Sequence, residues 1–584
     1  MRDTAHVSTT ETMTDHIVVF GFHGLGRRIV RQLATARQPV IVVDPDASPA
    51  EREDLQRWGV SYLDGYGHSE DTLAAAGVAR AHAVMCVTGD DVANIRLALL
   101  VRDVSSEVRL VVQMANASVG SAMAAVAQPG AVLNVAELAS TSFLEAAVRR
   151  TTHALDLGGE EFLMATFDAT SEGTFRTLWG DLAPIAVQPA DGSAVIPCPG
   201  RDRAVGPGDR VTLIGTAEDY AEIGLAPAIQ QAAPRGRSLR NRARESMAAL
   251  SDAVDRPFRI AFGVLAVLAA LSVGVLMLGY EEADGTRMNV LDAVYFTSET
   301  IATVGFGDFY FRDQDAWLRL WAIVLVLMGA TLVALATALF TNALISRRLE
   351  QSLGRQRLTG LRDHIVVIGL GAVGSRVAMD LHDAGYEVAV IDGGEGQRFV
   401  PQMRAAGIPV LLGDATLPAT QAAAGIQRAA GVAVLTSDDL VNIETGLAVR
   451  GAVGERTVPI VLRVFSRNLA RMVGMRLDAG TPRSIAELAS PWFVGAALGL
   501  DVLGTFYIGP TPFVAARLTV RAGSGLDGVA MADLGARSRV VAVGRAPGSA
   551  ALEHPARRDT RLAAGDSAFL IGPYDALLSV LQRS

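Results

Sequence analysis

Short apolar runs alternate with stretches of helical periodicity in two parts of the chain. The first part contains the runs HIVVF, PVIVVD, GVSYLD, HAVMCVT and RLVVQM, and a helix-like stretch follows each of the first four. Strands separated by helical segments predict right-handed crossovers and a parallel, doubly wound sheet. Residues 160–225 and 505–580 change to a strand-rich, turn-rich pattern. We therefore expect two α/β Rossmann-like lobes, each followed by a small α+β lobe.

The chain contains an internal duplication, which explains why this pattern occurs twice. A shift of 348 residues brings matching residues together without a gap; they are Asp15 with Asp363, Gly26 with Gly374, Asp44 with Asp392, and Asn94 with Asn442. After a slip of two residues, AELAS at 136–140 matches AELAS at 486–490. Each copy therefore extends over at least about 125 residues, as expected for a duplicated domain.

Two long uncharged stretches separate the copies. Ile260 to Gly279 and Leu320 to Ile345 contain twenty and twenty-six residues, and about 20 apolar residues are enough to span a bilayer. Arginines precede the first stretch and follow the second, whereas the connection between them begins with Glu281 and Glu282. By the positive-inside rule, the connection lies outside the cell membrane and both duplicated modules are cytoplasmic.

These patterns together predict a mixed architecture, in which a two-helix transmembrane module lies between two Rossmann-like modules. The expected segments, in chain order, are a disordered N-terminus (1–14), the first Rossmann-like lobe (15–150), its small lobe (151–228), a basic linker (229–257), the outer helix (258–280), a shorter helix and the turn after it (289–308), the inner helix (317–346), a linker (347–362), the second Rossmann-like lobe (363–500) and its small lobe (501–584).

Composition and charge restrict the possible functions. Half of the residues are apolar, which fits a largely soluble chain with a small membrane part. The net charge of −9 argues against nucleic acid as a partner, because phosphate binding requires a concentrated basic face. Two cysteines, Cys86 and Cys198, are too few for a disulfide framework. The polar N-terminus lacks the apolar core of a secretory signal.

A glycine-rich turn in the second copy predicts a nucleotide site. Gly369, Gly371 and Gly374 form Gly-x-Gly-x-x-Gly between a strand and a helix, and Asp392 ends the next strand. The first glycine permits a tight turn, the second lets the backbone approach a phosphate, and the third lets helix meet strand. Asp392 is expected to accept ribose hydroxyls. NAD(H), ATP, ADP and AMP all suit this pattern, and a sheet retained only as a scaffold is the alternative. The other expected ligand-side residues are Leu370, Ala372, Val373, Gly413, Asp414, Ala415, Thr436 and Arg463.

The corresponding turn of the first copy is altered. Gly21, Gly26 and Asp44 are kept, but His23 occupies the position of the second glycine. Elsewhere, Gly65-Tyr66-Gly67 replaces Gly413-Asp414-Ala415 and Gln113 replaces Arg463. The first copy therefore binds a different ligand or none, and we expect none.

The connection between the apolar stretches contains NVLDAVYFTSETIATVGFGDFYF. Asn289 to Ala302 has helical spacing and leads into Thr303-Val304-Gly305-Phe306-Gly307-Asp308. This region, residues 289–308, resembles the pore helix and selectivity filter of potassium channels, with Phe306 in place of the commoner tyrosine. The resemblance implies that K⁺ binds the backbone oxygens of Thr303, Val304, Gly305 and Phe306 and the Thr303 hydroxyl, where four subunits replace the hydration shell of the ion.

Two residues near the filter carry further expectations. Glu299 and Asp308 lie nine residues apart and could share a proton behind the filter; alternatively, Glu299 faces water at the outer mouth. Gly329, in the middle of the inner helix, is a candidate gating hinge, or it permits close helix packing.

A two-helix pore joined to Rossmann-like modules resembles the RCK (KTN) potassium-channel family. In the second copy, the resemblance covers GLGAVG, Asp392, GDAT at 413–416 and TSDDLVN at 436–442. The chain departs from the commoner family plan because one module precedes the pore. The resemblance implies a homotetramer in a lipid bilayer whose eight cytosolic modules form a gating ring. Ligand at the second module would then regulate the pore, while the first module mainly builds the ring.

Three other functions remain to be weighed against this interpretation. An NAD-dependent enzyme would need a substrate domain with a catalytic His or Lys, and the small lobes show no such constellation. A cation channel with weak K⁺ selectivity and a non-conducting membrane nucleotide sensor also fit the pattern, and ion-flux measurements would separate them.

Overall fold

The computed structural model describes residues 13–67, 69–115, 117–124, 132–225, 256–282, 285–352, 358, 361–394, 397–465, 469–470, 472, 479–534, 537–545, 552–557 and 559–581. Most of the expected disordered N-terminus (1–14) and basic linker (229–257) lies outside these residues. The chain divides into two compact units, one formed by Met1–Pro234 with Leu361–Ser584 and the other by Arg235–Gly360.

The first Rossmann-like lobe is built on a six-stranded parallel sheet with the order β3-β2-β1-β4-β5-β6. Its strands are β1 (Ile17–Phe20), β2 (Val40–Val43), β3 (Ser61–Leu63), β4 (Ala83–Cys86), β5 (Arg109–Gln113) and β6 (Val132–Leu133). Its helices are α2 (Leu25–Thr35), α3 (Pro49–Arg57), α4 (Glu70–Ala75), α5 (Asp91–Val104) and α6 (Ala117–Met123). Every residue of β1, β2 and β4 is buried, as uniformly apolar runs covered by helices on both faces require.

The second Rossmann-like lobe repeats this topology in the order β16-β15-β14-β17-β18-β19. Its strands are β14 (Ile365–Ile368), β15 (Val388–Asp392), β16 (Val410–Leu412), β17 (Gly431–Val434), β18 (Ile460–Arg463) and β19 (Thr481–Arg483). Its helices are α14 (Ala372–Asp383), α15 (Val400–Ala405), α16 (Pro418–Ala423) and α17 (Asp439–Val453). The predicted fold class, two doubly wound parallel sheets, is confirmed.

Each small lobe is a five-stranded antiparallel sheet with short helices. The first has the order β11-β10-β13-β8-β7 and the second β20-β21-β24-β22-β23. The first contains β7 (Thr152–Leu157), β8 (Glu160–Asp168), α8 (Phe175–Trp179), β10 (Ala183–Gln188), β11 (Ile196–Pro197), β13 (Arg210–Gly215) and α9 (Ala217–Glu222). The second contains β20 (Asp501–Ile508), β21 (Thr511–Thr519), β22 (Arg539–Gly544), β23 (Leu552–Glu553), β24 (Ser567–Pro573) and α20 (Tyr574–Leu581). One apolar core includes Phe162 of the first lobe and Phe513 of the second, so the two lobes pack together.

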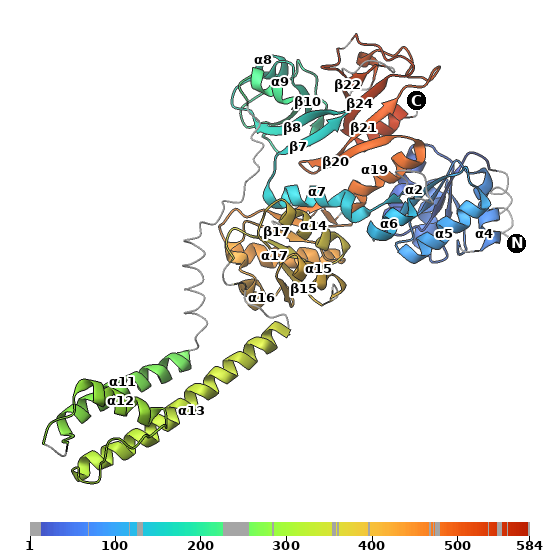
Figure 1. Ribbon diagram of the computed structural model, residues 1–584. Coiled ribbons are helices and arrows are strands. Elements are labelled where there is room, and N and C mark those ends of the chain that lie inside the picture. The colour runs from blue at the N-terminus through green and yellow to red at the C-terminus, as the bar shows by residue number, and fades with distance from the viewer. Residues whose placement is uncertain are drawn as a thin grey trace. The chain divides into compact units, whose positions relative to one another are not determined.

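Two helices exchange places between the copies. The helix α7 (Val135–Val148) belongs to the first copy but packs on α14 of the second, whereas α19 (Ile485–Leu498) belongs to the second copy and packs on α2 of the first (Figure 1). Phe143 of α7 lies in one core with β14 and β15, and Phe493 of α19 lies in one core with β1 and β2. Each Rossmann-like lobe is thus completed by a helix from the other copy.

Matching ion pairs accompany this exchange. Arg28 of α2 lies 3.5 Å from Glu487 of α19, and Arg376 of α14 lies 3.7 Å from Glu137 of α7. These residues correspond to one another in the duplication, so the contact between the copies is close to symmetric at this point.

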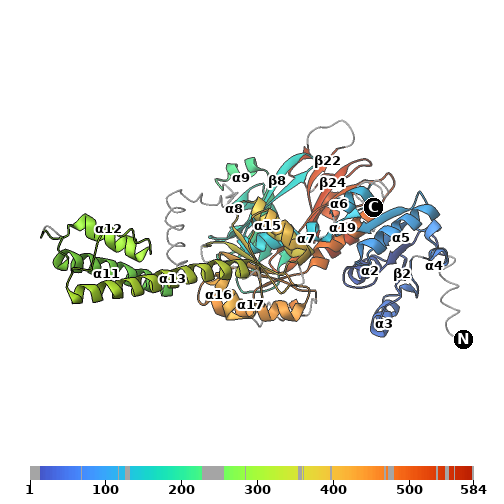
Figure 2. The same ribbon diagram turned by 60° about the horizontal axis from the view of Figure 1, so that its bottom comes forward.

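The membrane unit consists of α11 (Arg256–Gly279), α12 (Val290–Ile301) and α13 (Ala316–Ser352), and α12 packs against both longer helices (Figure 2). Two segments, Ile260–Gly279 and Ala316–Thr341, are long and apolar enough to cross a membrane. The helix α13 continues to Ser352, whereas we expected the inner helix to end at 346 and a linker to begin there. Residues 347–352, RRLEQS, contain no Gly or Pro and are mostly good helix formers, so the helix continues beyond its apolar part.

Replacing the buried ring of α19 should weaken the first lobe, although the substitution lies in the second copy. Phe493→Ala removes a fully buried side chain, and such truncations cost about 3–5 kcal/mol. We expect faster amide hydrogen exchange in β1 and β2, measured by mass spectrometry on the full chain. Leu99→Ala, at an exposed position of the first lobe, is the control and should leave exchange unchanged. Faster exchange confined to the second Rossmann-like lobe would contradict the exchange of helices.

Candidate functional site

The segment after the pore helix α12 has an alternating backbone conformation. Thr303, Gly305 and Gly307 have positive φ values of 60°, 58° and 81°. Glycine adopts this region without strain, whereas an L-residue such as Thr303 pays a cost. Alternation of left-handed with ordinary residues turns successive peptide groups so that their carbonyls can face one side, which is the arrangement an ion filter uses. Val304 and Phe306 are 52% and 68% exposed in the single chain.

Hydrogen bonds hold this segment to α12. The carbonyl oxygen of Glu299 accepts from the N–H of Val304 at 2.8 Å, and its buried carboxylate accepts from the N–H of Phe306 at 3.4 Å. The hydroxyl of Tyr295 donates to Asp308 at 3.0 Å, and its ring stacks on Phe306 with centroids 6.4 Å apart. Glu299 therefore supports the filter backbone rather than facing water.

The structure gives Glu299 and Asp308 separate hydrogen-bond partners, and the expected proton-sharing pair stays a prediction. Tyr295 lies one helical turn before Glu299 on the same face of α12, and its hydroxyl donates to Asp308, whereas Glu299 accepts from Phe306. Tyr295, which contacts Asp308 and Phe306, was not identified from the sequence, and its i, i+4 spacing from Glu299 was the pattern that could have revealed it.

Gly329 lies where the inner helix approaches the end of the pore helix. A Cβ built at this position would stand 3.2 Å from the side chain and 3.3 Å from the backbone of Ile301. Close packing therefore gives a sufficient reason for this glycine, and the gating hinge stays a prediction.

In the second copy, two of the three turn glycines are needed for packing alone. A Cβ at Gly369 would stand 2.8 Å from the backbone nitrogen of Thr436, and a Cβ at Gly374 would stand 1.9 Å from the carbonyl oxygen of Gly369. The first copy shows the same constraints at Gly21 and Gly26, where the nearest atoms stand at 2.7 and 2.0 Å. The presence of these glycines therefore does not by itself indicate a ligand.

Gly371 differs from the other two, because a Cβ at this position would meet no atom within 4 Å. It is the N-cap residue of α14, and no side chain among the described residues caps this helix. The free N–H groups and partial positive charge of a helix N-terminus favour a phosphate. The open space in front of Gly371 fits the phosphates of a nucleotide, with Ala372 and Val373 supplying the next two N–H groups.

Asp392 is less available to a ribose than we expected. One of its oxygens accepts from the N–H of Leu370 and the other from the N–H of Gly394, both at 2.8 Å, and the residue is buried. In the first copy, Asp44 accepts in the same way from the N–H groups of Phe22 and Asp46. The acid therefore ties the glycine turn to the next strand in both copies, which explains why the altered copy keeps it.

The ends of the neighbouring strands bring the remaining candidates to the same edge of the sheet. The Thr436 hydroxyl donates to Asn442 at 2.7 Å, and Asn442 donates to the carbonyl oxygen of Arg463 at 2.9 Å. Asp414, after Gly413 and before Ala415, accepts from the N–H and hydroxyl of Thr416. These two hydrogen bonds lower the pKa of the Asp414 carboxyl, so it is ionised at neutral pH.

Arg463 carries a positive charge with unused donor capacity. Its guanidinium lies 4.5 Å above the ring of Phe465, and its Nε is buried without a hydrogen-bond partner in the described part of the chain. Burial lowers the pKa of Arg463 to about 10, so the charge remains at neutral pH but is poorly solvated. A buried cation of this kind fits an anionic ligand. Phe465 was not identified from the sequence.

The first copy has lost this arrangement. His23 stands where Gly371 stands in the second copy, with its ring nitrogens 3.8 Å from Asp44 and 3.4 Å from Glu51. Its side chain faces two carboxylates, and α2 begins after its own N-cap residue, Gly24. Gln113, in the place of Arg463, supplies no positive charge.

Comparison with known proteins places these sites in a family. The TrkA-N domain family matches residues 17–127 and 365–479, and the ion channel domain family matches residues 262–346. The chain belongs to the RCK-domain family of potassium channels. It is therefore a membrane protein in which the channel domain lies between two RCK modules.

Individual relatives of this RCK-family chain are distant. An uncharacterized protein of Methanothermus fervidus is 26% identical over 27% of the chain, and the voltage-gated potassium channel Kch of Escherichia coli is 26% identical over 26% of it. The matches cover only 25% and 37% of those two proteins. The solved structure of the GsuK channel shares the fold, with a TM-score of 0.50 and 16% identity over 98% of this chain and 79% of that one.

The three glycines of the second turn should respond differently to substitution. Gly374→Ala forces a Cβ into the carbonyl of Gly369 and should lower the melting temperature of the purified chain by several degrees, because helix and strand must separate. Gly371→Ala meets open space at a negative φ of −81° and should leave melting unchanged. Equal effects of the two substitutions would contradict the packing role of the third glycine.

Proposed function

We propose that the chain forms a homotetrameric, potassium-selective channel of the cell membrane with both RCK modules in the cytoplasm. The observation that carries this proposal is the alternation of positive φ at Thr303, Gly305 and Gly307 between two helices of bilayer length. The exposed filter residues Val304 and Phe306 supply surface for neighbouring subunits. Potassium ions would bind the carbonyls from Thr303 to Phe306, and the arginines flanking the two spans support the cytoplasmic position of the modules.

The second module is the proposed ligand sensor. The open helix N-terminus at Gly371 and the poorly solvated cation of Arg463 support binding of an adenine nucleotide or NAD(H) at this edge of the sheet. Coupling between two sites is typically about 1–3 kcal/mol, so four subunits would supply roughly 4–12 kcal/mol. Shifting a gate from 1:99 to 99:1 needs about 5.5 kcal/mol, so four sensors are sufficient.

The proposed role of the first module is structural. His23 and Gln113 remove the open phosphate position and the cation, while helix α19 still packs on this lobe. The chain acts in this proposal through binding and conformational change and not as an enzyme.

Ion flux tests the channel. The full chain, purified and placed in liposomes, should carry K⁺ much faster than Na⁺ down a concentration gradient, measured with and without each nucleotide. Gly305→Ala should abolish flux, because a side chain at φ 58° strains the filter backbone. Gly285→Ala, also at a positive φ but outside the filter, is the matched control and should conduct normally.

The alternatives give different results in this assay. Equal flux of Na⁺ and K⁺ would identify a weakly selective cation channel. Absence of flux under all nucleotide conditions, with the protein folded and inserted, would identify a non-conducting nucleotide sensor.

Ligand-dependent melting tests the sensor. NAD, NADH, ATP, ADP and AMP are each added to the purified chain, and at least one should raise its melting temperature. Gly371→His and Arg463→Gln copy residues of the first module and should weaken binding of this nucleotide roughly ten- to hundred-fold. The histidine fills the phosphate position, and the glutamine removes a charge-assisted hydrogen bond. His23→Gly, in the first module, should leave the nucleotide-induced shift in melting temperature unchanged. If no nucleotide shifts melting, the sensor proposal fails while the pore proposal stands.

A further inference from the structure

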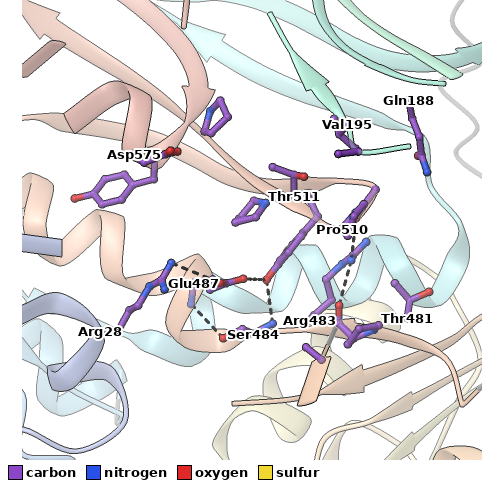
Figure 3. Close-up of a pocket in the computed structure, with 18 of the residues that line it drawn as sticks. Arg28, Gln188, Val195, Thr481, Arg483, Ser484, Glu487, Pro510, Thr511 and Asp575 are labelled. Carbon is purple, nitrogen blue, oxygen red and sulfur yellow. Dashed lines mark hydrogen bonds and ion pairs between the residues drawn. The ribbon is translucent and has the colours of Figure 1, made fainter. Parts of the chain in front are cut away.

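A cavity of about 970 Å³ lies within the unit formed by the two RCK modules. Its walls come from α2 of the first Rossmann-like lobe, the loop between β10 and β11, β19 and the start of α19, the hairpin of β20 and β21, and α20. Figure 3 shows Arg28 and Glu487 on one side, Pro510 and Thr511 of the hairpin in the middle, and Gln188 and Val195 on the other side. The cavity is separate from the glycine turns of both copies, since none of their residues lines it.

The charges that line the cavity are mainly positive. Four arginines face two carboxylates across it, and two of these arginines are paired, Arg28 with Glu487 at 3.5 Å and Arg537 with Asp575 at 2.9 Å. Arg31 and Arg483 have no carboxylate within ion-pair distance among the described residues. In a chain with a net charge of −9, an excess of arginine in one cavity points to an anionic ligand.

Arg483 is held in place but not neutralised. Its Nη1 donates to the carbonyl oxygens of Pro482 and Gly509, both at 3.2 Å, and its guanidinium lies 4.2 Å above the ring of Tyr507. Its Nε is buried without a partner in the described chain. Burial lowers the pKa of Arg483 to about 10, so it stays charged at neutral pH. A poorly solvated cation with no carboxylate within ion-pair distance is costly, and a bound anion would offset that cost.

A buried hydroxyl adds a further polar group to the cavity lining. Tyr574, at the start of α20, lines the cavity, and its hydroxyl is buried without a hydrogen-bond partner among the described residues. Much of the remaining lining is apolar and rigid, with prolines at 482, 510, 512 and 573. A ligand that fits therefore has a compact anionic part and an apolar part.

Comparison of the two copies shows that the arginines of the cavity are not a general feature of the duplicated fold. The positions that correspond to Arg31 and Arg483 in the other copy are Met379 and Leu133. Gln32 and Thr35 of the cavity wall correspond to Asp380 and Asp383, so the related face of α14 carries acids instead. The ion pair of Arg28 with Glu487, by contrast, is repeated by Arg376 with Glu137. The copies have thus kept the packing and diverged in the charges that surround the cavity.

We propose that this cavity binds a small phosphate-bearing organic anion, with its anionic groups held by the arginines of the lining, Arg31 and Arg483 among them, and its apolar part against the prolines. Arginine is the side chain best suited to phosphate, because its planar fork matches the phosphate oxygens. The lining comes from both modules, so the ligand links helix α2 of the first to the hairpin of the second. This second site does not depend on nucleotide binding at Gly371.

Binding of pyrophosphate to the full chain tests the proposal. All measurements use the Gly371→His background, which closes the glycine turn of the second module, and buffers are matched in ionic strength with potassium chloride. Pyrophosphate should bind saturably, and its binding is measured by calorimetry and by the shift in melting temperature. Arg31→Met and Arg483→Leu, each copied from the other module, should weaken binding at least roughly tenfold, as expected for loss of a charge-assisted hydrogen bond.

Arg521→Met, which removes an exposed arginine outside the cavity lining, is the matched control and should bind pyrophosphate normally. Absence of saturable binding, or equal affinity in Arg31→Met and the parent chain, would overturn the proposal. Arg31 is exposed and its replacement does not endanger folding, so this variant decides the question even if Arg483→Leu is unstable. Failure of the nucleotide site alone would leave the result unaffected.

Discussion

The exchange of α7 and α19 is the contact on which the cytosolic unit depends. Each helix buries its apolar residues on the Rossmann-like sheet of the other copy, so neither lobe has a complete core without its counterpart. Because each small lobe follows its exchanged helix in the chain, the exchange also brings the two small lobes together around one shared core. The position of the arginine-lined cavity follows from this arrangement, since its walls belong to elements that the exchange places side by side.

The same packing explains what the altered copy has kept. Gly21 and Gly26 stand against backbone atoms and Asp44 ties two loops together, so these three residues are required whether or not a ligand binds. His23 and Gln113, by contrast, replace residues that the second copy does not need for this packing. A glycine motif therefore combines two kinds of residue, and the second glycine and the distant arginine carry the information about binding.

Much of this architecture could be predicted from the sequence, because buried parallel strands and bilayer-length helices leave strong periodic patterns. The parallel, doubly wound sheets, the pore helix and the glycine turn follow from such local patterns. The exchange of α7 and α19 could not be predicted, because two similar sheets offer each helix equally apolar surfaces and periodicity does not distinguish them. The partner of Asp308 was missed for a related reason: the spacing of the two carboxylates did not show that the Tyr295 hydroxyl donates to Asp308.

Fusion of both modules into one polypeptide has a consequence for how they can evolve. In an assembly of identical modules, every substitution appears on both sides of a twofold contact, so an arginine introduced on one face also appears on the other. Here the two faces are encoded separately, and Arg31 can be selected without altering Met379. Two modules joined in one chain can therefore evolve a binding site at one of their two related contacts and leave the other contact unchanged. A symmetric dimer of identical modules cannot do this, because each substitution occurs at both contacts.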